Sequence, residues 1–463
     1  MEFQKNDVYT LSIEEIGSDG EGIGKIDGYP FFVKDTVPGD VVKIKAIKVK
    51  KTYGYGRVEE IISSSPNRVE AKCPVARPCG GCNFQHYSYE KQLEYKQNKV
   101  KNCLERIGGL LGIEDKMSPI IGMEEPWYYR NKAQFPVGIN KEGQIITGFY
   151  AGRTHSIIEQ NHCYIQSKVN EQILKIVTDF LNEHQITTYD ETTGKGLVRH
   201  ILTRVGFTTK EIMVCLVLNG TKLPYWEKLV EKLRQIDGMA SICINCNMER
   251  TNKILGQKVK TLWGKDKIVD CIGNIQYEIS PLSFYQVNPI QTKALYETAL
   301  QYADLKGEET VWDLYCGIGT ISLFLAQKAK KVYGVEIIEE AIYDARKNAA
   351  LNQMDNVEFF VGKAEEILPK QYEKTKEYAD VLVVDPPRKG CDKQLLETMI
   401  TMQPKKIVYV SCDPATLARD VKILCESGYE VEKVQAVDMF PQTVHVESVI
   451  MMTYCGFKAK NKE

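Results

Sequence analysis

The chain has 463 residues, of which 43% are hydrophobic and 26% are charged, with 34 Gly and 17 Pro. This composition excludes a mini-protein, a collagen-like chain and a globally disordered chain, and the length suggests about three domains. The 60 Lys and Arg nearly balance the 61 Asp and Glu, so the net charge of −1 gives no overall attraction to a polyanion. Because no run of about 18 apolar residues and no leader-like apolar stretch occurs, we expect a cytoplasmic chain without a membrane span, its 14 Cys reduced.

The first part of the chain, residues 1–61, consists of short β-prone runs separated by glycines. This pattern predicts a small antiparallel β-barrel. Six basic residues and no acidic ones lie from Lys43 to Arg57, with Tyr53 and Tyr55 among them. Such a strip suits nucleic acid, since phosphates pair with the charges and bases stack on the rings. A solvated strand face is the alternative interpretation.

The middle part, residues 62–285, begins with a linker-like run at 63–66, a cysteine-rich loop and a charged helix predicted over 89–107. Mixed α+β sequence follows. Three cysteines lie in the loop and a fourth comes much later in the chain: Cys73, Cys79, Cys82 and Cys163. The C-x5-C-x2-C spacing, in a loop whose prolines and glycines free backbone amides to face sulfur, predicts a metal site. Four thiolates suit zinc or a [4Fe-4S] cluster, and His86 and His162 are nearby alternative ligands.

The third part, residues 286–463, alternates strands and helices. Strands are predicted at 311–314, 331–336, 357–362, 381–385, 406–411 and 448–454. This alternation is typical of a doubly wound, mostly parallel sheet, whose ligands lie at the carboxyl ends of the strands.

A glycine-rich turn, Asp313–Thr320 (DLYCGIGT), follows the first of these strands, and Glu336 ends the second about 20 residues on. The turn lets a ligand approach the backbone, and the carboxylate can accept both hydrogen bonds of a ribose diol. These features fit NAD or S-adenosylmethionine. Ser322, at the place of the third glycine of the dinucleotide motif, disfavours NAD. The turn Asp385–Arg388 (DPPR) carries a second carboxylate to the same edge and favours the methyl donor, while a turn made only for packing is the alternative.

Cys412 lies between the strand predicted at 406–411 and a helix for which Asp413 is the expected N-cap and Pro414 the first residue. Because a helix N-terminus lowers the pKa of a thiol, we expect a reactive thiolate here rather than a structural cysteine. A thiolate that adds to C6 of a pyrimidine makes C5 nucleophilic enough to take a methyl group, and a base must then remove the C5 proton. Glu447 is the candidate base, with His445 in support on the same strand face.

Five motifs occur in a fixed order along the chain: SFYQVN (283–288), DLYCGIGT (313–320), DPPRKG (385–390), SCDPATLARD (411–420) and HVES (445–448). With them, the chain resembles the bacterial RNA (uracil-5-)-methyltransferase family. It is most similar to the iron-sulfur 23S ribosomal RNA members that carry an N-terminal TRAM domain, an RNA-binding barrel. The resemblance covers nearly the whole chain, and the motifs are specific in combination.

The resemblance implies an OB-like TRAM β-barrel at 1–61, an α+β central domain at 62–285 and an α/β class I (Rossmann-like) S-adenosylmethionine methyltransferase domain at 286–463, with part of 88–110 packed on the last. It implies that Cys412 is the nucleophile and Glu447 the general base. The cofactor contacts that it implies are Gln286, Tyr315, Glu336 and Asp385. It favours a [4Fe-4S] cluster held by Cys73, Cys79, Cys82 and Cys163.

The substrate implied by this resemblance is a uridine of 23S ribosomal RNA, flipped out of its helix and methylated at C5 by a monomeric enzyme. Other readings remain open at this point. A tRNA uracil-C5 enzyme or a cytosine-C5 enzyme would use the same thiol chemistry. A non-catalytic RNA-binding chaperone would grip RNA without a covalent adduct, and an oxidoreductase would bind nicotinamide.

Overall fold

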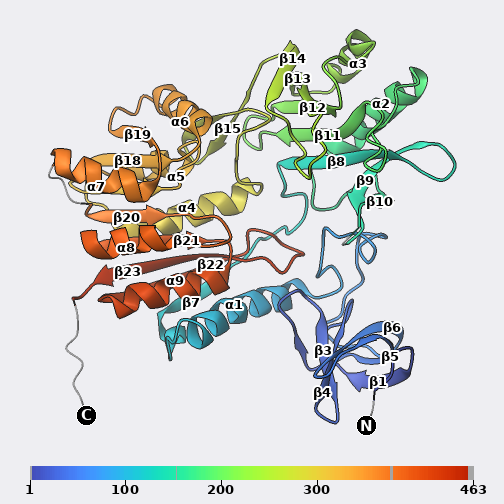
Figure 1. The fold of residues 1–463 in the computed structure, drawn as a ribbon, viewed down its shortest axis with the longest axis horizontal. Helices are drawn as coiled ribbons and strands as arrows, with labels where there is room; N and C mark the ends of the chain where they lie inside the picture. The colour runs from blue at the N-terminus through green and yellow to red at the C-terminus, as the bar shows by residue number, and fades with distance from the viewer. Residues whose placement is uncertain (1–2, 153, 376–378, 457–463) are drawn as a thin grey trace.

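The computed structural model describes residues 3–152, 154–375 and 379–456, so the last seven residues of the expected third domain lie outside the described part. Figure 1 shows three lobes: the N-terminal barrel at the lower right, a second sheet at the upper right and a larger α/β lobe at the left. In the described part of the chain, no helix combines the length and the apolar character needed to cross a membrane.

The N-terminal lobe is a single curled sheet in the order β1-β5-β6-β4-β3-β2. Its strands are β1 (Val8–Ser12), β2 (Glu15–Ile16), β3 (Gly22–Ile26), β4 (Tyr29–Val33), β5 (Val41–Val49) and β6 (Gly54–Ser63). Alternate apolar residues of β4 and β5, among them Phe31, Val42 and Ile44, point inward and form its core. The predicted N-terminal barrel is confirmed.

The basic strip of this barrel lies on β5, β6 and the turn between them. Lys43, Lys48 and Arg57 are exposed, and the rings of Tyr53 and Tyr55 contact each other and that of Phe32, with centroids 5.7–5.8 Å apart. Across β5 and β6, Lys48 pairs with Tyr55 and Lys45 with Arg57, so basic and aromatic residues occupy neighbouring positions on these strands.

The central lobe is a seven-stranded sheet in the order β10-β9-β8-β11-β12-β13-β14, with two helices packed on it. The elements are β8 (Lys132–Ile139), β9 (Ile145–Tyr150), β10 (Ile157–Glu159), α2 (Val169–Glu183), β11 (Val198–Val205), β12 (Ile212–Leu218), α3 (Trp226–Leu233), β13 (Met239–Cys246) and β14 (Lys258–Gly264). β12 (IMVCLVL) is apolar throughout because both of its faces are covered. Val214 and Leu216 join the core under α2 and α3, whereas Met213 and Cys215 belong to the core shared with the α/β lobe.

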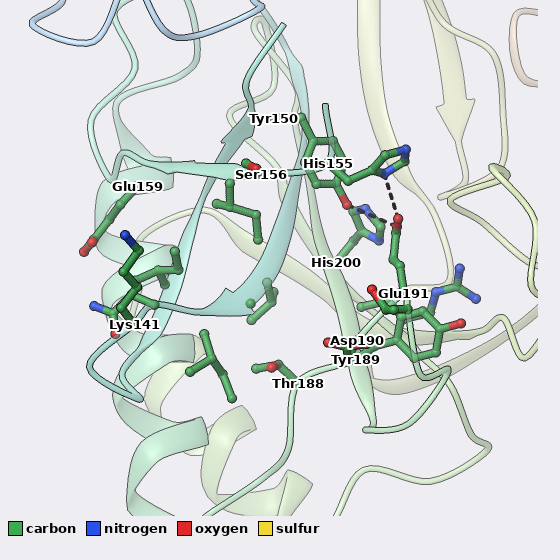
Figure 2. Close-up of a pocket in the computed structure, with 18 of the residues that line it drawn as sticks. Lys141, Tyr150, His155, Ser156, Glu159, Thr188, Tyr189, Asp190, Glu191 and His200 are labelled. Atoms are coloured by element: carbon green, nitrogen blue, oxygen red, sulfur yellow. Dashed lines mark hydrogen bonds and ion pairs between the residues drawn. The ribbon is translucent and has the colours of Figure 1, made fainter. Parts of the chain in front are cut away.

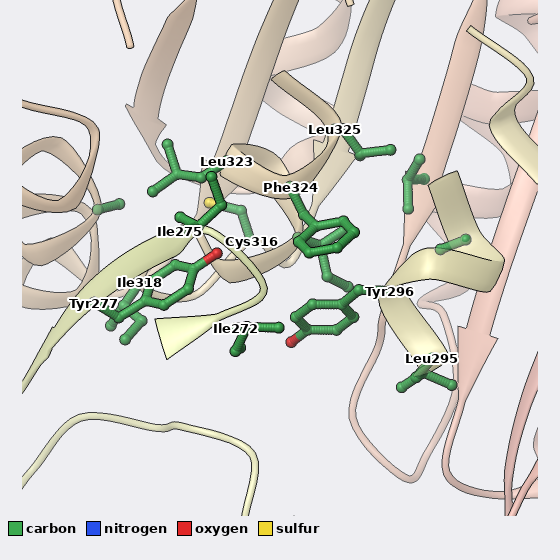
Figure 3. Close-up of a cluster of buried hydrophobic side chains, with 14 of the residues drawn as sticks. Ile272, Ile275, Tyr277, Leu295, Tyr296, Cys316, Ile318, Leu323, Phe324 and Leu325 are labelled. Atoms are coloured by element: carbon green, nitrogen blue, oxygen red, sulfur yellow. The ribbon is translucent and has the colours of Figure 1, made fainter. Parts of the chain in front are cut away.

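A hairpin of β15 (Ile268–Ile272) and β16 (Ile275–Ile279) lies between the central sheet and the α/β lobe. Figure 3 shows Ile272, Ile275 and Tyr277 of the hairpin beside Tyr296 and Phe324 of the α/β lobe, all within one apolar cluster. The two lobes are thus joined by a continuous core.

The α/β lobe has an eight-stranded sheet in the order β19-β18-β17-β20-β21-β23-β22-β7. Its strands are β17 (Thr310–Leu314), β18 (Lys331–Glu336), β19 (Val357–Val361), β20 (Val381–Val384), β21 (Lys406–Ser411), β22 (Tyr429–Val437) and β23 (Glu447–Tyr454), with β7 described below. The first five strands in the order are parallel to one another, and β23 is antiparallel to β21. The helices are α4 (Pro289–Ala303), α5 (Thr320–Ala326), α6 (Glu339–Leu351), α7 (Ala364–Thr375), α8 (Lys393–Met402) and α9 (Pro414–Glu426). This arrangement confirms the predicted Rossmann-like fold.

The segment that follows the cysteine loop also belongs to the α/β lobe. Helix α1 (Tyr89–Arg106) packs against α9, the short 3-10 helix η1 (Ile113–Lys116) follows, and β7 (Met117–Ile121) pairs in parallel with β22 at the sheet edge. Val100 and Leu104 of α1 lie in the core with residues of β21 and α9. The lobe that carries the expected active site is therefore built from two separate stretches of the chain (Figure 1).

A buried ion pair fixes helix α1 to the α/β lobe. The Lys96 ammonium pairs with a carboxylate oxygen of Asp438, and both side chains are 0% exposed. Asp438 also accepts a hydrogen bond from the Tyr89 hydroxyl at 2.8 Å, and Lys96 donates a second one to the carbonyl of Phe440 at 3.0 Å. Since each charge has its partner and further hydrogen bonds, removal of one would leave the other buried and uncompensated.

We expect Lys96→Met to lower the free energy of unfolding by about 3–5 kcal/mol, measured by urea denaturation. The control is Lys393→Met, which removes one member of the exposed Lys393–Glu397 pair of α8 and should cost less than about 0.5 kcal/mol. A double variant, Lys96→Met with Asp438→Asn, should recover part of the loss because no charge is left unpaired. Equal stability of Lys96→Met and the control would contradict this role.

Candidate functional site

The residues that the sequence singles out gather at one edge of the eight-stranded sheet. Glu336 ends β18, Tyr315 follows β17, Asp385 follows β20 and Cys412 follows β21. Parallel strands bring their carboxyl ends to the same edge. β23 runs the other way, and the pairing of Ser411 with Ser448 places its first residue, Glu447, at this edge as well.

The glycine-rich turn after β17 leaves room for a ligand. Gly317 has a φ of +54°, and a Cβ added there would meet no atom within 4 Å. Gly319, at φ +83°, is required for packing, because a Cβ there would lie 2.9 Å from the ring of Phe359. The turn thus presents open backbone on one side and packs closely on the other, as a phosphate- or nucleoside-binding turn does.

Two carboxyl groups flank this turn. Glu336 accepts backbone hydrogen bonds from Ile337 at 2.8 Å and Ile338 at 3.1 Å through one oxygen, and from Gly317 at 3.3 Å through the other. Asp313 is buried and accepts from the Ser322 hydroxyl at 2.5 Å, and burial raises its pKa to about 7. Glu336 is therefore fixed at the rim where a ribose diol would bind.

Gln286 lies in the segment before α4. Its backbone carbonyl accepts a hydrogen bond from the Asn131 side chain at 2.8 Å, and the backbone amide of Asn131 donates to the carbonyl of Val287 at 2.8 Å. Asn131 lies just before β8, so these contacts link the segment to the central lobe. Of the four expected cofactor contacts, Tyr315, Glu336 and Asp385 lie at the carboxyl ends of their strands, and Gln286 lies in this separate segment.

Cys412 faces two carboxyl groups. Burial first, then Glu447 and Asp385, raise the pKa of its thiol to about 11, while the Arg388 guanidinium acts in the opposite direction. Asp413 caps α9 as predicted, accepting from the amides of Ala415 at 2.9 Å and Thr416 at 3.1 Å. The helix N-terminus alone does not make this thiol a thiolate, so the expected low pKa is wrong, because burial and the two acids outweigh the effect of the helix.

Glu447 is 3% exposed, and burial, reinforced by Asp385, raises the pKa of its carboxyl to about 8. Burial likewise raises the pKa of Asp385 to about 7. These groups can therefore gain or lose a proton near neutral pH, as an acid-base catalyst must.

His445 does not share a strand face with Glu447, because β23 begins only at Glu447 and His445 lies in the preceding loop. Burial and then Arg388 lower the pKa of its imidazole to about 4, so its ring is neutral at pH 7. The sequence argument from strand alternation is wrong for this residue.

Arg388 is the participant that sequence reasoning left without a role. It is exposed, and its charge acts on Cys412, His445 and Glu447 alike. The sequence of the DPPR turn already indicated this position. Arg388 follows Asp385 by only three residues, so it has to lie near the edge of the sheet where Asp385 lies.

The four expected metal ligands also face one another. Burial first, and then the charges of Cys163, Cys79 and Cys73, raise the pKa of the Cys82 thiol to about 12. Amide groups approach the sulfurs: Gly81 N is 3.4 Å from Cys79 Sγ, and Gln85 Nε2 is 3.3 Å from Cys82 Sγ. Gln160 Nε2 is 3.6 Å from Cys73 Sγ, and backbone amides of Ile165 and Gln166 face Cys163. Such donors stabilise thiolates bound to a metal group.

The histidines near this loop have other surroundings. His162 pairs with Glu171 at 2.9 Å through Nδ1, and its Nε2 lies 3.2 Å from the Tyr128 hydroxyl. Desolvation and the charge of Arg68 lower the pKa of His86, which lies among residues of the barrel. Of the expected and alternative ligands, the four cysteines are thus the group whose thiols act on one another.

Comparison with known proteins gives a consistent picture. A family model described as tRNA (uracil-5-)-methyltransferase matches residues 88–454, and a TRAM domain model matches residues 2–58. The chain is 52% identical over 458 residues to an uncharacterized RNA methyltransferase of Clostridium tetani, covering 99% of this chain and 98% of that protein. It is 53% identical over 449 residues to one of Halalkalibacterium halodurans, covering 97% of each.

Among solved structures, the chain is similar to the tRNA (uracil-54, C5)-methyltransferase of Pyrococcus abyssi, solved in complex with S-adenosyl-L-homocysteine. The TM-score is 0.77 at 29% identity, covering 96% of this chain and 99% of that one. The likeness thus extends over all three lobes.

The charges around Cys412 lead to a prediction about its reactivity. Replacement of Glu447 by Gln removes a negative charge that raises the pKa of the thiol, so alkylation of Cys412 by iodoacetamide at pH 8 should become about tenfold faster. Mass spectrometry of the modified peptide measures the rate. Glu430→Gln, a carboxylate on β22 that is not among the groups acting on Cys412, is the control. Slower alkylation in Glu447→Gln would contradict the assigned electrostatics.

Proposed function

Because this chain belongs to the tRNA (uracil-5-)-methyltransferase family, we propose that it methylates C5 of a uridine in RNA through a covalent bond between Cys412 and C6 of the base. The observation that carries the proposal is the convergence of Cys412, Glu447 and Asp385 at the edge of the sheet that also presents the open Gly317 turn. The S-adenosylmethionine-dependent fold, the RNA-methyltransferase relatives and the TRAM barrel agree with it.

The proposed reaction balances as follows. The thiol proton of Cys412 passes to the carboxylate cluster, Sγ bonds to C6, and the electron pair of the 5,6 double bond moves toward the C4 carbonyl oxygen as an enolate. C5 would then bond to the methyl carbon of the donor, whose bond to the sulfonium sulfur breaks and leaves that sulfur as a neutral thioether. Glu447 accepts the C5 proton, the electron pair of the C5–H bond restores the 5,6 double bond, and the Sγ–C6 bond breaks with its electron pair leaving on Sγ. A carboxyl with a pKa of about 8 suits this exchange near neutral pH.

The cofactor would be held by Gln286, Tyr315, Glu336 and Asp385. When bound, S-adenosylmethionine supplies the methyl group and a positively charged sulfonium. We propose that Glu336, whose carboxylate accepts three backbone amides, would accept the ribose hydroxyls, with Gln286 and Tyr315 as further contacts. Asp385 acts on the Cys412 thiol, and its proposed contact with the donor would link the two.

We further propose that Cys73, Cys79, Cys82 and Cys163 hold a [4Fe-4S] cluster. The C-x5-C-x2-C spacing is unusual for a zinc finger, and the chain resembles the iron-sulfur members of the family. The thiols act on one another electrostatically, and the side-chain and backbone amides that approach the sulfurs would stabilise the thiolate ligands of such a cluster.

The target that we propose is a uridine of 23S ribosomal RNA, modified by a monomeric enzyme in the cytoplasm. The cysteine loop and the barrel are the features that support it, because the chain resembles the iron-sulfur ribosomal RNA enzymes in both. A tRNA uridine is the second candidate, since the Pyrococcus abyssi structure that spans the same lobes is a tRNA enzyme.

The decisive experiment uses RNA that carries 5-fluorouridine, because fluorine at C5 cannot leave as a proton does and the adduct persists. Incubation of the full chain with 23S rRNA and tRNA transcripts and the methyl donor should give an adduct that survives denaturing electrophoresis. Cys412→Ala should reduce its yield at least about 100-fold, and the exposed Cys455→Ala should leave it unchanged. An adduct with rRNA is expected; an adduct with tRNA alone would support the second target.

Two outcomes would overturn the mechanism. An adduct that forms in Cys412→Ala would show that another group is the nucleophile. Tight RNA binding with no adduct in any RNA would favour the non-catalytic alternative.

The metal proposal has its own test. Protein purified without oxygen should be brown and contain about four irons per chain, measured by plasma emission spectroscopy. Cys79→Ala should lose most of the iron, whereas Cys103→Ala, on α1 outside the loop, should keep it. A colourless protein with one zinc per chain would contradict the cluster.

A further inference from the structure

A second cavity lies in the central lobe, outside the edge of the sheet that carries Cys412. It has a volume of about 670 Å³ and opens between the β8–β9 hairpin, β10 and the loop at 188–192. Figure 2 shows the side chains of Tyr150, His155, Glu191 and His200 gathered on one side of it, with Lys141 and Glu159 on the other. None of the catalytic or metal-binding residues lines this cavity.

Aromatic side chains dominate one wall. The rings of Tyr150 and His155 lie 5.3 Å apart, and that of His200 is 6.4 Å from Tyr150. Tyr189 stacks on the guanidinium of Arg199 at 4.4 Å, and Arg199 is itself held by two backbone carbonyls, those of Asn247 at 2.9 Å and Glu249 at 2.8 Å. A ring fixed on a planar cation in this way is a rigid platform for stacking.

Acidic side chains stand among the polar groups that line the cavity. Glu191 receives the Tyr150 hydroxyl at 3.3 Å on one oxygen and pairs with His155 Nδ1 at 2.7 Å on the other, which orients its carboxylate toward the cavity (Figure 2). Asp190 lies beside it. His200 is 4% exposed, and among the described residues neither of its ring nitrogens has a hydrogen-bond partner. Such a buried, unpartnered polar group at a cavity wall is costly unless a ligand satisfies it.

We propose that this cavity takes an unpaired nucleobase with an exocyclic amino group, adenine or cytosine, from the substrate RNA. Carboxylates accept hydrogen bonds from such an amino group and repel the two carbonyl oxygens that uracil presents. The carboxylates also repel phosphate groups. The base would therefore enter the cavity while the RNA backbone stays at its rim, where Lys141 lies. The cavity reads a base other than the methylated uridine.

The position of the cavity agrees with a role in RNA recognition. The carbonyl of Tyr150 accepts a hydrogen bond from the backbone amide of Gly80 at 3.2 Å, and Cys79 and Ala151 form a β-bridge. The cavity wall is therefore continuous with the cysteine loop. Through that loop it is linked to the segment before Glu447, because the amides of Asn83 and Phe84 both donate to the carbonyl of Gln442. A base bound in the cavity and a uridine at Cys412 would thus be held by parts of the chain that these backbone contacts link.

The test uses the full chain and adenosine, cytidine and uridine 5′-monophosphates, titrated by ligand-observed NMR. Saturating S-adenosylhomocysteine is present in every titration to occupy the proposed donor site. Binding of adenosine monophosphate at that site is thereby excluded from the measurement. We expect the adenine and cytosine nucleotides to bind at least about fivefold more tightly than the uracil nucleotide.

Three variants of the cavity and one control test the assignment. Glu191→Gln should abolish the preference over uracil, and Tyr189→Ala should weaken binding of adenosine monophosphate about tenfold. Tyr189→Phe keeps the ring and should retain binding, which separates loss of stacking from loss of fold. Glu227→Gln, an exposed carboxylate on α3 outside the cavity, should have no effect.

Equal binding of all three nucleotides, or binding that is unchanged in Glu191→Gln and Tyr189→Ala, would overturn the proposal. It rests on RNA being the substrate but not on the chemistry at Cys412. Nucleotide binding needs no methyl transfer. If nucleotides bind as expected but no adduct forms with 5-fluorouridine RNA, the proposed reaction alone is refuted. An intact adduct without nucleotide binding would refute this second site alone.

Discussion

The buried contact between Lys96 and Asp438 is the interaction on which the arrangement of the lobes depends. Asp438 comes directly after β22, so the ion pair fixes the start of the segment 438–446, which leads to Glu447. Every lobe reaches this segment. Gln92 of α1 and Gln442 exchange two hydrogen bonds at 3.0 and 3.1 Å, the Tyr129 hydroxyl of the central lobe donates to the carbonyl of Pro441, and Val444 packs on the barrel's Val37. The proposed base is therefore positioned by contacts from all three lobes.

This junction also explains why a buried ion pair is tolerated. An apolar substitute would pack between α1 and the sheet, but it could not also hold a tyrosine hydroxyl and a backbone carbonyl in place. Lys96 and Asp438 do so, through Phe440 and Tyr89, and Tyr89 in turn accepts from the backbone amide of Met123 at 2.8 Å. One polar network thereby connects the helix after the cysteine loop, the strand β7 behind it and the loop before Glu447. We infer that the pair specifies geometry more than it adds stability.

Local sequence predicted the parts of the structure in which residue type and function coincide. The DLYCGIGT turn, the DPPR turn and the Asp413 cap each lie where a strand ends. They could be predicted because Gly, Pro and Asp favour turns and helix caps through their own backbone geometry and hydrogen bonds, independent of the rest of the fold. Two strands of the sheet, β22 and β7, were not predicted. The sequence of β7, MSPII, has no pattern that indicates pairing with a strand more than 300 residues later. Lys96 could not be found in this way either, because it reads as one of many charges on a solvated helix until the tertiary fold buries it.

The electrostatics around Cys412 bear on how the proposed nucleophile would be activated. Burial, Glu447 and Asp385 all raise the pKa of its thiol, and burial raises the pKa of both carboxyl groups as well. The Arg388 guanidinium lowers the pKa of Cys412, and a positively charged methyl donor held beside Asp385, as proposed, would lower it further. In the proposed reaction, the charge of the donor and the helix N-terminus at Asp413 would therefore act together to make the thiolate available.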